Sequence, residues 1–160
     1  STNQSAKFCG TPPLAHIAGL ETAIALLEAE GLPNVWTRHQ RLAGAVHAAV
    51  ERWAVPGAMR FHARLPETRS ASVTAIEVAP GIDPEALRTV ARERFQVAMA
   101  GGLGPLAGRV FRIGHLGDMN EPMILGALAG IEAAMTVQKI PFGTDGVAAA
   151  VAFLAAQSTR

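Results

Sequence analysis

This 160-residue chain has a single cysteine, no methionine at its start and no long apolar run. The single cysteine, Cys9, excludes an internal disulfide framework and favours a reducing compartment, so we expect a plain thiol in a cytoplasmic protein. No stretch reaches the roughly 18 uninterrupted apolar residues of a membrane span. The polar N-terminus lacks the apolar core of a signal peptide. Processing, or excision from a longer protein, explains the missing initiator methionine.

The chain also lacks an excess of either positive or negative charge. The 14 lysines and arginines nearly balance the 13 acidic residues, so the formal net charge is only +1, and the signs are interspersed. Because nucleic-acid-binding domains carry a basic patch or stripe, no nucleic-acid partner is expected. What the chain has in excess is apolar residues, at 49%. A chain of this length can bury its own core, and the apolar excess fits helices packed on several sides, as at a domain or subunit interface.

Two helices are predicted in the first third of the chain. Thr11-Pro12-Pro13 is expected to open the first, with the Thr11 hydroxyl accepting from free first-turn N–H groups, and Gly31 to end it. The second is predicted to start at Asn34 and to end at Pro56-Gly57. Both tryptophans, Trp36 and Trp53, are expected in the core. The buried face of the second helix is expected to hold Val35, Leu42, Val46, Val50 and Trp53, and its other side Arg38, Arg41, Ala45, Ala48 and Arg52.

The rest of the chain alternates between strand and helix patterns. Helices are predicted from Asp83-Pro84, where a cap precedes a first-turn proline, from Asn120 to Val137, and over 147–156. The helix after Asn120 is apolar nearly all round, with Glu132 as its main polar interruption. Strands are predicted at Met59–Arg64, Ser72–Val78, Gln96–Ala100 and Arg109–Ile113. This order predicts an α+β fold with helices packed on a largely antiparallel sheet of three to four strands.

Arg112 is the residue whose position in a strand is most informative. Side chains alternate between the two faces of a strand, so Phe111 and Ile113 are expected in the core while Arg112 points the other way with Val110. A guanidinium on a rigid strand has two parallel N–H donors that match the two oxygens of a carboxylate. An ordinary solvated arginine is the alternative, and on spacing alone it is the commoner case.

The loop Gly102–Ala107 has the letters of a dinucleotide-binding fingerprint. That fingerprint must open a helix whose N-terminus faces the pyrophosphate. Here Pro105 lies inside the motif, and a strand pattern follows it. A tight connection between two strands, with glycines supplying positive φ angles, is therefore favoured.

His115, Asp118 and Glu121 are possible metal ligands, but no second histidine or cysteine cluster accompanies them. A helix entry is favoured, with Asn120 as cap and Glu121 stabilised by the helix dipole. No metal is expected. Four further histidines are expected to be surface or packing residues: His16, His39, His47 and His62.

The run Ala98–Asp118 resembles the small-domain signature of class V aminotransferases, which are fold-type I pyridoxal-phosphate enzymes. Within that family it is most similar to the alanine–glyoxylate and serine–glyoxylate group. Residues 31–43 and 120–146 are similar to the same group, so the resemblance covers essentially the whole chain. Its most specific part is Gly101–Gly117.

The resemblance implies a domain organisation and a small set of roles. Residues 1–11 would form an N-terminal arm and residues 12–160 the small C-terminal domain, with the large cofactor-binding domain absent from this chain. Arg112 stands where the family's arginine binds the α-carboxylate of the substrate. Thr11 stands where the family's threonine contacts the cofactor phosphate of the partner subunit in a homodimer. Phe8 occupies a position at which the family often has a tyrosine with the same role.

The family's cofactor-bearing lysine and its pyridine-binding aspartate belong to the large domain, and neither Lys7 nor Lys139 matches the lysine motif. No catalytic residue is therefore expected in this chain. The resemblance implies a transaminase that uses pyridoxal phosphate to move an amino group from serine or alanine to a 2-oxo acid such as glyoxylate or pyruvate. This chain would supply the carboxylate-binding arginine and would be inactive alone.

Two alternatives stay open. In the first alternative, the chain would be a stand-alone module that binds an amino acid or a partner without catalysis. The missing lysine favours this alternative. Otherwise the chain belongs to another enzyme of the superfamily, such as a cysteine desulfurase or an aminoethylphosphonate transaminase. Desulfurases place a mobile catalytic cysteine in this half of the protein, and Cys9 in the N-terminal arm does not fit that place.

Overall fold

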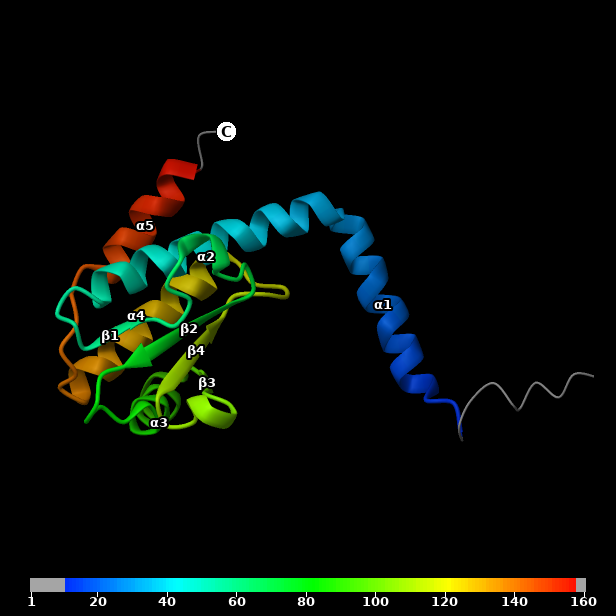
Figure 1. Cartoon of the computed structure of the whole chain (residues 1–160). Helices are drawn as coiled ribbons and strands as arrows, with labels where there is room; N and C mark the ends of the chain where they lie inside the picture. The colour runs from blue at the N-terminus through cyan, green and yellow to red at the C-terminus, as the bar shows by residue number, and fades with distance from the viewer. Residues whose placement is uncertain (1–10, 158–160) are drawn as a thin grey trace, which may run out of the picture. The chain divides into compact units, whose positions relative to one another are not determined.

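A computed structural model describes residues 11–157, which fall into two units that meet in sequence between Thr37 and Arg38 (Figure 1). The expected division into residues 1–11 and 12–160 stays a prediction. Across residues 11–157, none of the helices combines the length and apolar character that crossing a membrane requires. The elements in chain order are α1 (Leu14–Glu30), α2 (Leu32–Trp53), β1 (Met59–Phe61), η2 (Pro66–Thr68), β2 (Val73–Val78), α3 (Pro84–Phe95), β3 (Ala100–Gly101), η3 (Gly104–Leu106), β4 (Val110–Gly114), α4 (Glu121–Val137) and α5 (Gly146–Gln157).

Helix α1 confirms the first predicted helix and corrects its cap. Gly31 ends the helix with a φ of +83°, and its N–H donates to the Leu27 carbonyl. Thr11 does not cap the helix, because Pro13 occupies the N-cap position and no side chain caps it. Thr11 lies two residues before this N-cap, and the Leu14 N–H donates to the Pro12 carbonyl at 2.9 Å.

None of the 17 residues of α1 is buried. One face at helical spacing is formed by Ile17, Leu20, Ile24 and Leu27. Leu26 lies on the opposite side of the helix. Part of the chain's apolar excess is therefore concentrated on a helix whose side chains are exposed. The exposed large apolar residues of α1 are Leu14, Ile17, Leu20, Ile24, Leu26 and Leu27.

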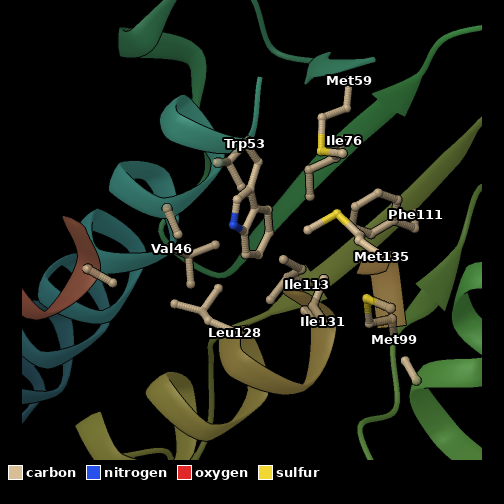
Figure 2. Packing of buried hydrophobic residues seen from close by; sticks show 14 of the residues in the cluster. Val46, Trp53, Met59, Ile76, Met99, Phe111, Ile113, Leu128, Ile131 and Met135 are labelled. Atoms are coloured by element: carbon tan, nitrogen blue, oxygen red, sulfur yellow. The ribbon is translucent and has the colours of Figure 1, made fainter. Parts of the chain in front are cut away.

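The second unit is built on a four-stranded sheet of order β1-β2-β4-β3, and every neighbouring pair is antiparallel (Figure 1). Ile76 on β2 pairs with Phe61 on β1 and with Phe111 on β4. Figure 2 shows these strands contributing Ile76 and Phe111 to one core with Trp53 from α2 and Met135 from α4. Helices thus pack on one face of an antiparallel sheet, which confirms the predicted α+β fold.

Helix α2 confirms the predicted stripe and corrects two residues beside it. All five stripe residues are buried. The helix starts at Leu32, two residues before the predicted start, and Ala45, expected on the other side, is also fully buried. Trp53 is buried as predicted, whereas Trp36 is 60% exposed. Trp36 follows Val35 by one residue, which places it about 100° around the helix from that buried position.

The predicted strand Gln96–Ala100 is wrong, because only Ala100 and Gly101 pair with β4. Gln96 ends α3 in the left-handed conformation, with φ +58°, and the Val97 N–H donates to the Ala91 carbonyl. This stretch is therefore the exit of a helix. Strand β1 is also shorter than predicted, ending at Phe61 before the turn η2.

Both polar caps predicted in the second unit are confirmed. Asp83 accepts from the Glu85 N–H at 2.8 Å to start α3, and Asn120 accepts from the Met123 N–H at 3.0 Å to start α4. Strands β2 and β4 and helix α5 lie within one or two residues of their predicted ranges. These elements position β4, which carries Arg112.

One half-buried carboxylate joins three helices. Oε1 of Glu132 on α4 accepts from the Trp53 Nε1–H of α2 at 2.8 Å and from the Val147 N–H of α5 at 2.9 Å. Gly146 makes this contact possible, since a Cβ there would lie 2.2 Å from Trp53 Nε1. Glu132, which interrupts an otherwise apolar helix, therefore links the start of α5 to α2 and α4.

Candidate carboxylate-binding site

Arg112 lies near the middle of β4 with its side chain on the face opposite the core. Phe111 and Ile113 on either side of it are buried, as alternation predicts, while Arg112 is half-buried. Its Nε–H donates to the Gly101 carbonyl of β3 at 2.8 Å. Neither Nη group makes a hydrogen bond or an ion pair with any residue from 11 to 157. The fork is thus held at one end, and its two terminal donors are unused.

The neighbours of Arg112 across the sheet are small and uncharged. Ala75 on β2 and Ala100 on β3 lie directly opposite it in the register. Directly opposite residues share a face of the sheet, so these two methyl groups flank the Arg112 side chain. They contribute no charge that would neutralise the guanidinium.

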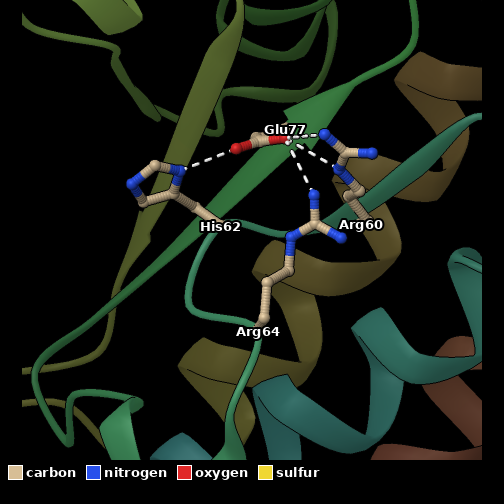
Figure 3. Close-up of polar contacts among 4 residues, drawn as sticks. All are labelled: Arg60, His62, Arg64 and Glu77. Atoms are coloured by element: carbon tan, nitrogen blue, oxygen red, sulfur yellow. Dashed lines mark hydrogen bonds and ion pairs between the residues drawn. The ribbon is translucent and has the colours of Figure 1, made fainter.

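Glu77 also lies on this face, diagonal to Arg112, but its carboxylate is bound by other cations (Figure 3). Oε1 is 2.8 Å from His62 Nδ1, Oε2 accepts from Arg60 Nε at 2.8 Å, and Arg64 lies 3.7 Å away. The hydrogen bonds from His62 and Arg60 hold the pKa of Glu77 below its usual value. Glu77 is therefore a satisfied carboxylate that does not compete for Arg112.

Thr11 lies in the first unit and is exposed. It does not cap α1, and within residues 11–157 its side chain makes no hydrogen bond. Its hydroxyl is therefore available to donate to a phosphate oxygen. Phe8, Cys9 and Lys7 fall outside the described residues. Lys139 is exposed and follows α4 with φ +54°.

The glycine-rich loop forms the predicted connection between two strands. The Gly102 N–H donates to the Val110 carbonyl at 2.8 Å, and a Cβ on Gly102 would lie 1.9 Å from the Leu106 carbonyl oxygen. The short turn η3 lies between the strands, and no α-helix starts there. The backbone is too close at Gly102 for any side chain, which explains one of the glycines.

The residues around His115 form a helix entry and a buried polar pair. Asn120 caps α4, and Glu121 pairs with Arg41 at 2.8 Å. His115 itself is fully buried, 2.9 Å from the Thr74 hydroxyl and 3.1 Å from the Ala71 carbonyl. Within the described range no three histidine, cysteine or acidic residues are grouped as a metal site would require.

The sequence carries a signal for the burial of His115. His115 follows Phe111 and Ile113 at the same two-residue spacing, which places all three on one face of an extended strand. His47 on α2 lies beside it, with ring centroids 6.1 Å apart. Burial, followed by the nearby His115 and Arg69, lowers the pKa of His47 to about 4.

An α+β unit that carries Arg112 on the sheet face opposite the core is the fold, and the comparisons assign it to a family. The family model for class-V aminotransferases matches residues 1–108. The chain belongs to the class-V aminotransferase family. Arg112 lies beyond the matched residues, so its role rests on its own geometry.

Individual relatives agree in family. The serine–glyoxylate aminotransferase of Methylorubrum extorquens is 42% identical over 95% of this chain and 37% of its own length. The L-aspartate–glyoxylate aminotransferase of Paracoccus denitrificans is 42% identical over 88% of this chain and 35% of its own. A crystal structure of the pyridoxamine–pyruvate aminotransferase from Mesorhizobium loti superposes with a TM-score of 0.85 at 32% identity, covering 94% of this chain and 38% of that one. The chain thus spans a little over a third of the length of these relatives.

Proposed function

We propose that this chain is the part of a pyridoxal-phosphate-dependent transaminase that binds the substrate carboxylate through Arg112. The observation that carries the proposal is the state of the Arg112 side chain between two alanines: its Nε–H donates to the Gly101 carbonyl, and neither Nη group has a partner among residues 11–157. Small amino acids such as serine or alanine, and 2-oxo acids such as glyoxylate or pyruvate, all carry an α-carboxylate. Relatives named for serine, aspartate, glyoxylate and pyruvate support these substrates.

Arg112 would act by orientation. Two parallel N–H···O bonds fix the plane of a carboxylate, so they also fix the direction of the α-carbon that is attached to it. Positioning of that kind supplies a large share of the rate enhancement of many enzymes. When bound, pyridoxal phosphate supplies the electron sink for negative charge at the α-carbon.

Thr11 would contribute a phosphate contact to the partner subunit of a homodimer. Its exposed hydroxyl has no partner within residues 11–157, so it is free to donate to a phosphate oxygen. No residue described in this chain matches the cofactor-bearing lysine. We therefore place that lysine elsewhere in the complete protein, and we expect this chain alone to have no transaminase activity.

The test is the exchange of Arg112 in the complete protein. Arg112→Ala should lower kcat/KM for glyoxylate. The loss of transition-state stabilisation should be roughly 2–5 kcal/mol, the range for truncating one partner of a charged pair. Arg112→Lys should lose less, since it keeps the charge but not the fork. Arg109→Ala is the control, because Arg109 is an exposed arginine three residues away in the same chain segment. An unchanged kcat/KM in Arg112→Ala would sink the assignment.

A stand-alone binding module is the second candidate, and the absence of a matching lysine favours it. Arg112 would then bind an amino-acid carboxylate without chemistry. The intact mass of the natural gene product separates the two candidates. A mass far above that of 160 residues supports the enzyme, whereas a mass equal to it, with serine binding to the chain alone, supports the module.

A further inference from the structure

Strand β3 is short, yet it holds the carbonyl that fixes Arg112. It contains only Ala100 and Gly101, and it lies at the edge of the sheet. Two residues of ladder pairing are a weak constraint on an edge strand. A second attachment comes from α3, where Arg88 Nε donates to the Met99 carbonyl, the last one before β3, at 2.8 Å.

Arg88 is itself held in place on α3. Its Nη1 pairs with Glu85, one turn earlier on the same helix, and the side chain of Arg88 is only 27% exposed. Glu85 is in turn fixed at the helix start, where its N–H donates to Asp83. The guanidinium of Arg88 therefore connects a capped helix end to the backbone just before β3.

Gly101 allows Arg88 to come this close. A Cβ at Gly101 would lie 2.7 Å from Arg88 Nη1 and 2.8 Å from Glu85 Oε1. Gly101 pairs with Phe111, a core residue, so its missing side chain would point to the helix side of the sheet. Its carbonyl accepts from Arg112 Nε. Gly101 is thus held between Arg88 on the helix side and Arg112 on the open side.

We propose that Arg88 is a positioning residue for carboxylate binding. The proposal rests on the proposed function, in which Arg112 binds the substrate carboxylate. Arg88 fixes the backbone from Met99 to Gly101, the Gly101 carbonyl fixes Arg112 Nε, and Nε sets the direction of the two Nη donors. Arg88 does not touch the substrate, because it lies behind β3. Its loss should loosen a bidentate contact whose strength depends on sub-ångström placement.

The experiment uses the complete protein and a matched pair of variants. Arg88→Ala is compared with Arg92→Ala, which removes the same charge one turn along α3 from an exposed arginine that pairs with its neighbour Glu93. The measurements are KM and kcat for glyoxylate and the inhibition constant of propionate, a carboxylate without a reactive carbonyl. Arg88→Ala should raise KM and the inhibition constant about tenfold and change kcat less than about twofold. Arg92→Ala should change none of them.

Two further variants make the result specific. Arg88→Lys keeps one donor for the Met99 carbonyl and should recover part of the lost affinity. Gly101→Ala forces the Arg88–Glu85 pair away while leaving both side chains present, so it should reproduce the effect of Arg88→Ala. It also serves as the test if Arg88→Ala does not fold.

Each outcome distinguishes the two proposals. If Arg112→Ala leaves the inhibition constant of propionate unchanged, the proposed function fails. If Arg112→Ala weakens propionate but Arg88→Ala and Gly101→Ala behave like Arg92→Ala, the role of Arg88 is overturned and that of Arg112 stands. A fall in kcat and thermal stability of Arg88→Ala with an unchanged inhibition constant would also overturn it, because it would show a structural role only.

Discussion

A single backbone carbonyl determines which N–H donors of Arg112 stay available to a ligand. A guanidinium has five N–H donors, and the bond from Nε to the Gly101 carbonyl uses one of them. Alternation along the strand predicts the face on which Arg112 lies. It does not predict the partner of Nε, because that partner depends on how the loop between β3 and β4 folds back. The orientation of the Arg112 guanidinium therefore follows from the tertiary structure and not from the sequence pattern.

His47 makes the stability of the second unit depend on pH. The groups facing it are Glu51 on its own helix, and His115 and Arg69 from other segments. Its pKa is lowered from 6.5 to about 4, so between these values the unfolded chain binds more protons than the folded one. The contribution of His47 is fully present above pH 6.5 and is lost as the pH falls towards 4.

We expect urea unfolding of the 160-residue chain to show this loss, up to about 3 kcal/mol for His47. In His47→Gln the free energy of unfolding should fall less steeply over the same pH range, since a glutamine does not titrate. His16→Gln, which changes an exposed histidine of α1, is the control and should keep the full slope. Equal slopes in His47→Gln and the unchanged chain would show that His47 is not the titrating group.

At the scale of elements, one carboxylate oxygen links α5 to α2 and α4, beside the apolar packing of Ala150 and Leu154. Glu132 accepts from Trp53 and from the Val147 N–H, so Glu132→Ala leaves two donors without a partner. We expect the free energy of unfolding to fall by about 1.5–3 kcal/mol, as for hydrogen bonds to a charged group. Circular dichroism during chemical denaturation measures this loss.

Glu132→Gln is the matched variant, because its amide carbonyl still accepts from both donors. It should lose less than half as much stability as Glu132→Ala. A loss as large in the glutamine variant would mean that the negative charge, rather than the acceptor, stabilises the three helices.

Local signals predicted the elements well, and partner-dependent features poorly. Asp83 and Asn120 were predicted as caps because a cap and its proline or dipole lie within four residues of each other. Gln96 was misjudged, because a left-handed glutamine ends α3 where a strand had been expected. Trp36 was misjudged because hydrophobicity alone does not say whether a side chain faces the core.

The candidate site was predicted in the same uneven way. The proposed role of Arg112 came from the strand pattern and the family resemblance, and Nη groups without a partner among residues 11–157 are compatible with that role. Arg88 could not be predicted, since its contact with the Met99 carbonyl depends on how α3 packs beside β3. The burial of His115 was predictable from alternation alone.

For the molecule as a whole, α1 predicts how the isolated chain behaves in solution. Its bulky face of Ile17, Leu20, Ile24 and Leu27 is exposed. Helices that are apolar on several sides are normally buried, so we expect the 160-residue chain to self-associate. Its weight-average mass in sedimentation equilibrium should rise with concentration.

Leu20→Glu should reduce this association at equal concentration. Thr22→Glu is the control, since it adds the same charge to α1 on a side away from Leu20. Both variants should leave the unfolding of the second unit unchanged. If the chain stays monomeric at all concentrations, or if the two variants associate equally, the bulky face of α1 is not the contact surface.

The contrast between Trp36 and Trp53 has an optical consequence. The sequence contains no tyrosine, so these two indoles supply nearly all the near-ultraviolet fluorescence of the chain. Trp36 is exposed in the first unit, and Trp53 is enclosed in the second. An enclosed indole emits at shorter wavelength than a hydrated one, so the tryptophans of the two units differ in emission wavelength. Replacing Trp36 by phenylalanine would leave a single natural reporter that follows the core of the second unit without any added dye.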